Sequence, residues 1–223
     1  MPAADLVILD FDGTLADTWR DIATAVNRAL RETGLPAVPG AEVRGWVGHG
    51  VLPLLRHAIG SAGAAGAPDI EVLYESFRRQ YADCCLDTTA LYDGMAAALD
   101  QLAGATLAIL SNKPGRFLDQ IVDGLGLRGR VAAVVGGDAL PVAKPDPATI
   151  AYVVRLAGPA ARVWMVGDSA VDIDTGRAFG ARTVGCTWGL RPVEELRQAG
   201  AELLIDHPAD LPPLLRRCGA VPS

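Results

Sequence analysis

The chain has 223 residues, half of them hydrophobic, which suffices for one α/β core or for a core with an inserted smaller domain. A net charge of −6 and the lack of a long apolar run lead us to expect neither a nucleic-acid partner nor a membrane partner. No basic leader precedes the first apolar segment, and the four cysteines follow no disulfide or metal-site pattern, so we expect a cytoplasmic protein.

The first apolar segment, residues 6–9, is predicted to be a strand that is buried on both faces of a sheet. Asp10, Asp12 and Gly13 follow it. In open parallel sheets ligands bind beyond the carboxyl ends of the strands, and glycine lets the backbone turn sharply there. The two carboxylates therefore suit a divalent cation and a phosphate, although simple turn residues at a strand end are the alternative.

Residues 16–90 show helical periodicity and no predicted strand. The first helix is predicted to begin at Asp17 or Thr18, either of which can cap it, and to stop at Gly34. The other predicted segments are two helices, 51–59 and 70–81, and a flexible linker of small residues between them, 60–68. We therefore predict an all-helical domain inserted after the first strand.

From residue 91 onward, helical segments alternate with short apolar strands, which predicts a parallel sheet with helices on both faces. The first strand joins this sheet, so the core is predicted to comprise residues 1–15 and 91–223, with the helical domain, 16–90, inserted between them. The predicted strands are 106–110, 131–135, 163–166, 183–186 and 203–205. Prolines are predicted to begin three of the helices, at Pro114, Pro147 and Pro192.

Polar residues follow four of the predicted strands, at the edge of the sheet where all carboxyl ends meet. Ser111 and Asn112 precede a helix N-terminus, which favours anions, and Lys144 stands before another helix. Asp168 and Asp172 follow the strand at 163–166. Each has a plain structural explanation by itself, such as a helix cap or an exposed charge. Together, several carboxylates and an ammonium group at one edge predict a bound Mg²⁺ ion and a phosphate, because unpaired like charges would repel.

Lysine is rare in this chain: of the 20 lysines and arginines, only Lys113 and Lys144 are lysines. A lysine that persists among arginines is expected where a compact point charge is needed that a guanidinium group cannot replace. Two residues alone do not exclude chance, so the argument for Lys144 rests on its surroundings.

Four motifs in this order, DFDGTLADT, LSNKP, AKPDP and GDSAVDI, resemble those of the haloacid dehalogenase superfamily, and the likeness covers nearly the whole chain. The resemblance implies a Rossmann-like α/β core, an inserted helical cap and a cytoplasmic Mg²⁺-dependent phosphatase. Such an enzyme would act on a small phosphorylated metabolite through an aspartyl-phosphate. Segments 45–50, 187–189 and 204–206 are similar to those of phosphoglycolate phosphatases, which makes 2-phosphoglycolate the expected substrate.

The resemblance also implies a role for each motif residue. Asp10 is the expected nucleophile and Asp12 the expected general acid and base, while Lys144 offsets the charge of the nucleophile and the phosphate. The implied phosphate-binding residues are Ser111, Asn112 and Lys144. The implied metal ligands are Asp10, Asp12, Asp168 and Asp172.

Two residues of the predicted cap are candidates for substrate specificity. His49 lies between Gly48 and Gly50, which allow a ligand to approach the backbone closely, and an exposed loop histidine is the alternative. Arg44 is suited to bind a substrate carboxylate through two nitrogens, and a solvated helix position is the alternative. We predict that the cap selects the substrate, because the core contacts mainly the phosphoryl group.

Other activities of the superfamily need different residues, which the sequence contains or lacks. A phosphosugar mutase would share Asp10 and Asp12 and remains an alternative, whereas a dehalogenase would need neither Asp12 nor the metal site. A phosphonate hydrolase of this superfamily would need a cap lysine, which residues 16–90 lack. A regulatory binding protein without turnover is a further alternative, which the intact set of charged residues disfavours. Both a monomer and a homodimer remain open.

Overall fold

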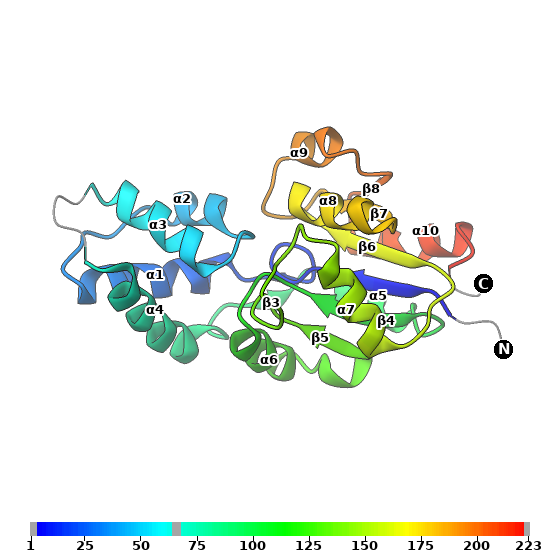
Figure 1. Cartoon of the computed structure of the whole chain (residues 1–223), viewed down its shortest axis with the longest axis horizontal. Helices are drawn as coiled ribbons and strands as arrows, with labels where there is room; N and C mark the ends of the chain where they lie inside the picture. The colour runs from blue at the N-terminus through cyan, green and yellow to red at the C-terminus, as the bar shows by residue number, and fades with distance from the viewer. Residues whose placement is uncertain (1–3, 64–67, 221–223) are drawn as a thin grey trace.

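The computed structural model describes residues 4–63 and 68–220, and its core is a six-stranded parallel sheet (Figure 1). The strands are β1 (Leu6–Leu9), β4 (Thr106–Leu110), β5 (Ala133–Val135), β6 (Val163–Gly167), β7 (Arg182–Cys186) and β8 (Leu203–Ile205). Their order is β5-β4-β1-β6-β7-β8, so β1 and β6 lie side by side at the centre. All of β1 is buried, as expected for a strand covered on both faces. The predicted α/β core is confirmed.

Side chains of β1 alternate between two hydrophobic clusters, one on each face of the sheet. The core helices are α5 (Met95–Asp100), α6 (Gly115–Gly124), α7 (Ala148–Ala157), α8 (Ala170–Phe179), α9 (Val193–Gln198) and α10 (Leu211–Arg217), with short 3₁₀ helices at Arg128–Arg130 and Pro208–Asp210. Leu6 and Ile8 pack with α7. Val7 and Leu9 belong to the larger cluster, which includes α6 and continues into the helices that precede residue 85.

Four helices stand beyond one end of the sheet, at the left in Figure 1. They are α1 (Trp19–Glu32), α2 (Gly40–Trp46), α3 (Val51–Ser61) and α4 (Ile70–Cys84). Two short antiparallel strands, β2 (Ala16–Asp17) and β3 (Ala90–Leu91), join them to the core. The apolar stripe of α1 is buried, and this helix packs mainly against α4. We call these four helices the cap; its exact limits at residues 16 and 90 stay a prediction.

The structure departs from the predicted elements in several places. Strand β2 lies within the segment that was predicted to be all helical, α4 extends to Cys84 past its predicted end at residue 81, and β5 begins at Ala133 instead of residue 131. Helix α2 is additional, because it buries only Val43 and so shows little periodicity. Helix α3 extends to Ser61, past the predicted end at residue 59, and residues 64–67 of the predicted linker lie outside the described residues. Helices α6, α7 and α9 begin one residue after their prolines, which occupy N-cap positions instead of the first turn.

No helix within residues 4–63 and 68–220 is both long and apolar enough to cross a membrane. All four cysteines of the chain lie in these ranges and carry free thiols. Cys84, Cys85 and Cys186 are buried, which suits small apolar side chains in a packed interior.

Candidate active site

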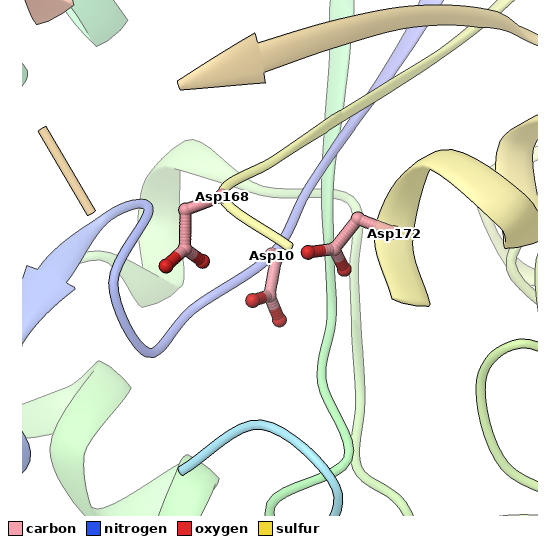
Figure 2. A group of neighbouring side chains, drawn as sticks. All are labelled: Asp10, Asp168 and Asp172. Carbon is pink, nitrogen blue, oxygen red and sulfur yellow. The ribbon is translucent and has the colours of Figure 1, made fainter. Parts of the chain in front are cut away.

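Three aspartates meet where the neighbouring strands β1 and β6 end (Figure 2). Asp10 follows β1, Asp168 follows β6, and Asp172 lies in the first turn of α8. One carboxylate oxygen from each residue lies within 4.8 Å of the others, and all three residues are buried. This arrangement of oxygen ligands suits a small divalent cation.

Hydroxyl and backbone donors fix two of these carboxylates. Asp172 Oδ2 accepts hydrogen bonds from the Ser169 backbone N–H at 3.2 Å and from the Ser169 hydroxyl at 2.6 Å, as part of the capping box that begins α8. Asp168 accepts from the Thr14 hydroxyl at 3.2 Å and from the Leu190 N–H at 2.7 Å. The two side chains are therefore held in place before any ligand binds.

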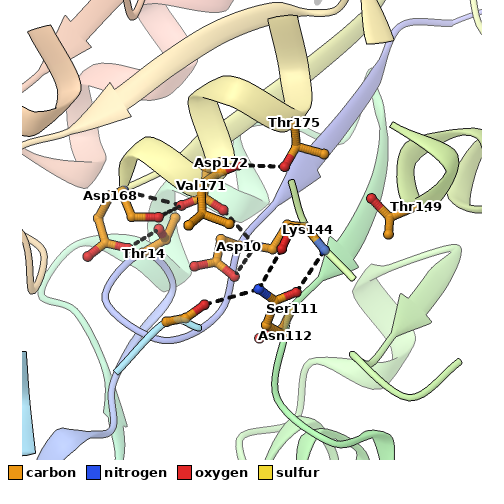
Figure 3. Close-up of polar contacts among 12 residues, drawn as sticks. Asp10, Thr14, Ser111, Asn112, Lys144, Thr149, Asp168, Val171, Asp172 and Thr175 are labelled. Atoms are coloured by element: carbon orange, nitrogen blue, oxygen red, sulfur yellow. Dashed lines mark hydrogen bonds and ion pairs between the residues drawn. The ribbon is translucent and has the colours of Figure 1, made fainter. Parts of the chain in front are cut away.

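Lys144 joins two of the aspartates (Figure 3). Its Nζ lies 2.7 Å from Asp10 Oδ1 and 2.6 Å from Asp172 Oδ1, and its side chain is 2% exposed. Asn112 positions the Lys144 backbone: its Oδ1 accepts from the Lys144 N–H at 2.9 Å, and its Nδ2 donates to the Lys144 carbonyl at 3.1 Å. The same Nδ2 donates to the Gly48 carbonyl of the cap at 3.1 Å. The motif lysine is thus a buried charge with a fixed position.

The site holds more negative charge than its lysines compensate. Burial, and then repulsion by Asp172, raises the pKa of Asp10 well above its usual range and that of Asp168 to about 7. Although burial opposes its charge, Lys144 keeps a raised pKa because Asp10 and Asp172 surround it. The buried ionisable groups here are four carboxylates and two ammonium groups, from Asp10, Asp12, Asp168, Asp172, Lys113 and Lys144. With all four carboxyls ionised, the site would carry a surplus of two negative charges, which a divalent cation would offset, so these residues fit Mg²⁺.

Asp12 stands apart from the group of three aspartates. Its Oδ1 accepts a hydrogen bond from the Thr18 hydroxyl at 2.6 Å and lies 3.0 Å from Lys113 Nζ. Lys113 Nζ in turn donates to the Tyr81 hydroxyl at 2.8 Å. The Asp12 carboxylate therefore faces the cap and lies outside the group formed by Asp10, Asp168 and Asp172, and its role as a metal ligand stays a prediction. A carboxyl in this position suits proton transfer to a leaving group.

A narrow pocket opens between the core and the cap above Asp10. Its core side is formed by the residues Asp10, Asp12, Ser111, Asn112, Lys113, Pro114 and Phe117. On the cap side the lining residues are mainly apolar, among them Ile22, Val47, Val51, Leu54 and Phe77. About 40 Å³ of the pocket is open to the centre of a water molecule, which is room for a few waters. The pocket therefore suits a small ligand.

The two specificity candidates do not line this pocket. Arg44 Nη2 donates to the Gly189 carbonyl of the core at 2.8 Å, and His49 is exposed, with its Nδ1 3.2 Å from Arg191 Nη2. Arg191 Nη2 also donates to the Val47 carbonyl at 2.8 Å. Both residues connect the cap to the core, since Gly189 and Arg191 follow strand β7, and their role in substrate specificity stays a prediction.

Of the residues that follow β4, Ser111 is placed to contact a bound ligand, whereas the contacts of Asn112 hold other residues in position. Ser111 is 2% exposed and lines the pocket with Asp10, and its role in binding phosphate stays a prediction. Asn112 was expected to bind phosphate, but its amide is occupied by the contacts to Lys144 and Gly48. No sequence pattern indicated a role for Tyr81, which has the spacing of any buried residue of an amphipathic helix. For Lys113 the only signal was the rarity of lysine.

Comparisons with known proteins identify the family of this chain. The family model described as haloacid dehalogenase-like hydrolase matches residues 7–186. A phosphoglycolate phosphatase of Pseudomonas putida is 35% identical over 220 residues, covering 96% of this chain and 79% of that protein. The phosphoglycolate phosphatase of Colwellia psychrerythraea is 32% identical, covering 91% and 92%.

Solved structures share the fold over nearly the whole chain. A protein from Haemophilus somnus, described as a predicted phosphoglycolate phosphatase, has a TM-score of 0.87 and 27% identity, covering 96% of this chain and 99% of that one. A Thermotoga maritima protein described as a candidate β-phosphoglucomutase has a TM-score of 0.75 and 22% identity, covering 96% and 99%, and this likeness concerns the fold alone. With a family match over most of its length and relatives above 30% identity, the chain belongs to the haloacid dehalogenase-like hydrolases.

Proposed function

We propose that this protein is a Mg²⁺-dependent phosphatase that hydrolyses 2-phosphoglycolate through an aspartyl-phosphate on Asp10. The observation that carries the proposal is the position of Asp10: it lines the pocket, and Lys144 Nζ holds its Oδ1 at 2.7 Å. No donor within residues 4–63 and 68–220 binds its Oδ2, which leaves that oxygen available for attack on phosphorus.

The reaction would proceed in two displacements. Asp10 Oδ2 forms a bond to phosphorus while the ester oxygen departs and takes a proton from the Asp12 carboxyl. Asp12 then accepts a proton from a water molecule, whose oxygen attacks the phosphorus and releases inorganic phosphate and the Asp10 carboxylate. Lys144 and the Ser111 hydroxyl would hold the phosphoryl oxygens throughout. When bound by Asp10, Asp168 and Asp172, Mg²⁺ would supply charge neutralisation and polarise a phosphoryl oxygen.

Two observations support the choice of substrate. Relatives at 32–35% identity over nearly the whole chain carry the name phosphoglycolate phosphatase. The small volume of the pocket and its apolar cap side offer few partners for the many hydroxyls of a sugar phosphate. We place the enzyme in the cytoplasm, which suits four free thiols in the described residues.

Phosphate release from purified protein tests the proposal. We expect hydrolysis of 2-phosphoglycolate with Mg²⁺, no hydrolysis with EDTA, and a loss of several orders of magnitude in Asp10→Asn. Interconversion of glucose 1-phosphate and glucose 6-phosphate without phosphate release would identify a mutase. Binding of phosphorylated metabolites with no turnover of any of them would identify a regulatory protein and refute the proposal.

A further inference from the structure

Two donors on the pocket wall have capacity for another acceptor. The Tyr81 hydroxyl accepts a hydrogen bond from Lys113 Nζ at 2.8 Å, and no group within residues 4–63 and 68–220 accepts its own hydrogen. The Lys113 ammonium has three N–H groups and two polar partners, the Tyr81 hydroxyl and Asp12 Oδ1 at 3.0 Å. Both residues line the pocket, and they are 1% and 7% exposed. A hydrogen-bond acceptor of a ligand placed between Tyr81 and Lys113 would accept the remaining hydrogen of each donor.

Packing fixes the position of these donors. Tyr81 belongs to cap helix α4, and its ring stacks on Phe77 at 5.4 Å and meets the edge of Phe117 of core helix α6 at 5.0 Å. Lys113 follows β4 and is held against Asp12. Burial raises the pKa of Tyr81 well above its usual value, so the hydroxyl stays a donor. The pair is therefore pre-organised, one donor from the core and one from the cap.

The other buried lysine of the site, Lys144, is paired with Asp10 and Asp172 and is assigned to the phosphoryl group. Among the described residues that line the pocket, Lys113 is the only cationic one, and the cap contributes mainly aliphatic and aromatic side chains. Arg44 and His49 are engaged outside it. An anionic group on the substrate would have to lie beside Lys113, because burying an unpaired carboxylate against apolar walls is unfavourable.

The location of Lys113 defines where on the substrate that anion sits. Its Nζ is 3.0 Å from the Asp12 carboxylate, the group assigned to protonate the departing ester oxygen. An anion beside Lys113 is therefore a close neighbour of that oxygen. We propose that Lys113 and Tyr81 bind a carboxylate carried one carbon from the ester oxygen, which makes phosphate esters of short 2-hydroxy acids the preferred substrate class. This inference rests on the proposed phosphatase function and assigns its specificity.

Two phosphonates that the enzyme cannot hydrolyse test the carboxylate site directly. 3-Phosphonopropionate carries the carboxylate at the required distance from phosphorus, and propylphosphonate replaces it with a methyl group. Titration of each into the Mg²⁺-loaded protein by calorimetry gives the ratio of their affinities. We expect the wild-type ratio to favour the carboxylate by at least about tenfold, as for a buried charge-assisted hydrogen bond.

Tyr81→Phe removes only the hydroxyl and keeps the aromatic packing, so the affinity ratio should fall at least about fivefold. Tyr74→Phe makes the same change on the same helix outside the pocket and should keep the wild-type ratio. Lys113→Gln provides a second variant, with a larger expected fall, and circular dichroism checks the fold of each. An unchanged ratio in folded Tyr81→Phe and Lys113→Gln overturns the assignment.

Kinetics separate this inference from the proposed function. The ratio of kcat/KM for 2-phosphoglycolate to that for ethyl phosphate, which lacks the carboxylate, should fall in both variants, chiefly through KM. If the wild-type protein hydrolyses the two esters equally well, the carboxylate site is refuted while the phosphatase function stands. If it hydrolyses neither ester in Mg²⁺, the proposed function itself fails.

Discussion

Replacement of Lys144 tests the charge balance of the site. The ammonium group contacts Asp10 and Asp172 at 2.7 and 2.6 Å, and its side chain is 2% exposed. Lys144→Met keeps the aliphatic length and removes the charge, so the surplus at the site grows from two negative charges to three. Lys144→Arg keeps the charge but replaces the compact ammonium group with a planar guanidinium group. The nitrogens of that group do not match the positions of Asp10 Oδ1 and Asp172 Oδ1, which both point at one atom.

The expected magnitudes follow from burial. Removing one partner of a buried ion pair costs about 3–5 kcal/mol, and loss of one preorganised positive contact to a transition state lowers kcat by about 10²–10³-fold. For Lys144→Met we expect a loss of kcat of about 10²–10³-fold. For Lys144→Arg we expect a loss of at least about tenfold, which corresponds to about 1.4 kcal/mol of transition-state stabilisation.

Mg²⁺ affinity distinguishes an electrostatic effect from a collapsed site. Loss of Lys144 raises the pKa of Asp10 and of Asp168 further, so the comparison is made at a pH high enough to ionise both carboxyls. There Lys144→Met should bind Mg²⁺ at least as tightly as the wild-type protein, because its site is more negative. Calorimetric titration with Mg²⁺ is paired with steady-state phosphate release at saturating metal. Loss of both metal binding and activity in Lys144→Met, or near-native kinetics in Lys144→Arg, would refute this account.

Three further predictions concern the glycines, the pH and the cap. Gly167→Ala should sharply weaken Mg²⁺ binding and turnover, because a Cβ there lies 2.2 Å from Asp172 Cγ, whereas Gly60→Ala, with no atom within 4 Å, should leave both at wild-type levels. In EDTA, the free energy of unfolding should fall as pH rises from about 4 to about 7, because folded Asp168, whose pKa is raised to about 7, still binds a proton that the unfolded chain has lost. Urea unfolding at several pH values should show a smaller fall in Asp168→Asn, and an equal fall contradicts the assignment. Arg191→Ala should raise KM several-fold by loosening the cap, and an unchanged KM would show that these contacts do not affect substrate binding.

The core could be predicted because its central strands are buried on both faces. Such strands are continuous apolar runs, so β1 and β4 have the predicted limits and β6 and β7 are each one residue longer than predicted. The edge strand β8 also has its predicted limits. The edge strand β5 begins at Ala133, two residues later than predicted, because only part of its apolar run pairs with β4. Helix α2 was missed because a short helix with one buried residue has no periodic signature.

Whether a functional residue could be placed from the sequence depends on whether its position follows from the end of a strand or from contacts between distant segments. Asp10 and Asp168 could be predicted to lie at the same edge of the sheet, because parallel strands all end there, and the structure shows that β1 and β6 are neighbours. The direction of a side chain depends on packing between distant segments, and the sequence carries no pattern for it. Arg44 contacts Gly189, and Asn112 contacts Gly48, so both side chains make their contacts at the junction between the cap and the core.

The junction between cap and core has a consequence for specificity. The Lys113 ammonium belongs to the core, while the Tyr81 hydroxyl reaches it only because α4 packs against α6 through the contact with Phe117. Gln120 of α6 also donates to the Ala82 carbonyl of α4 at 2.9 Å, which holds the two helices in register. The carboxylate site therefore exists only when the cap is seated. A substrate without a carboxylate would gain no binding energy from this site when the cap packs on the core. A catalytic core that can bind many phosphate esters can therefore select one class among them.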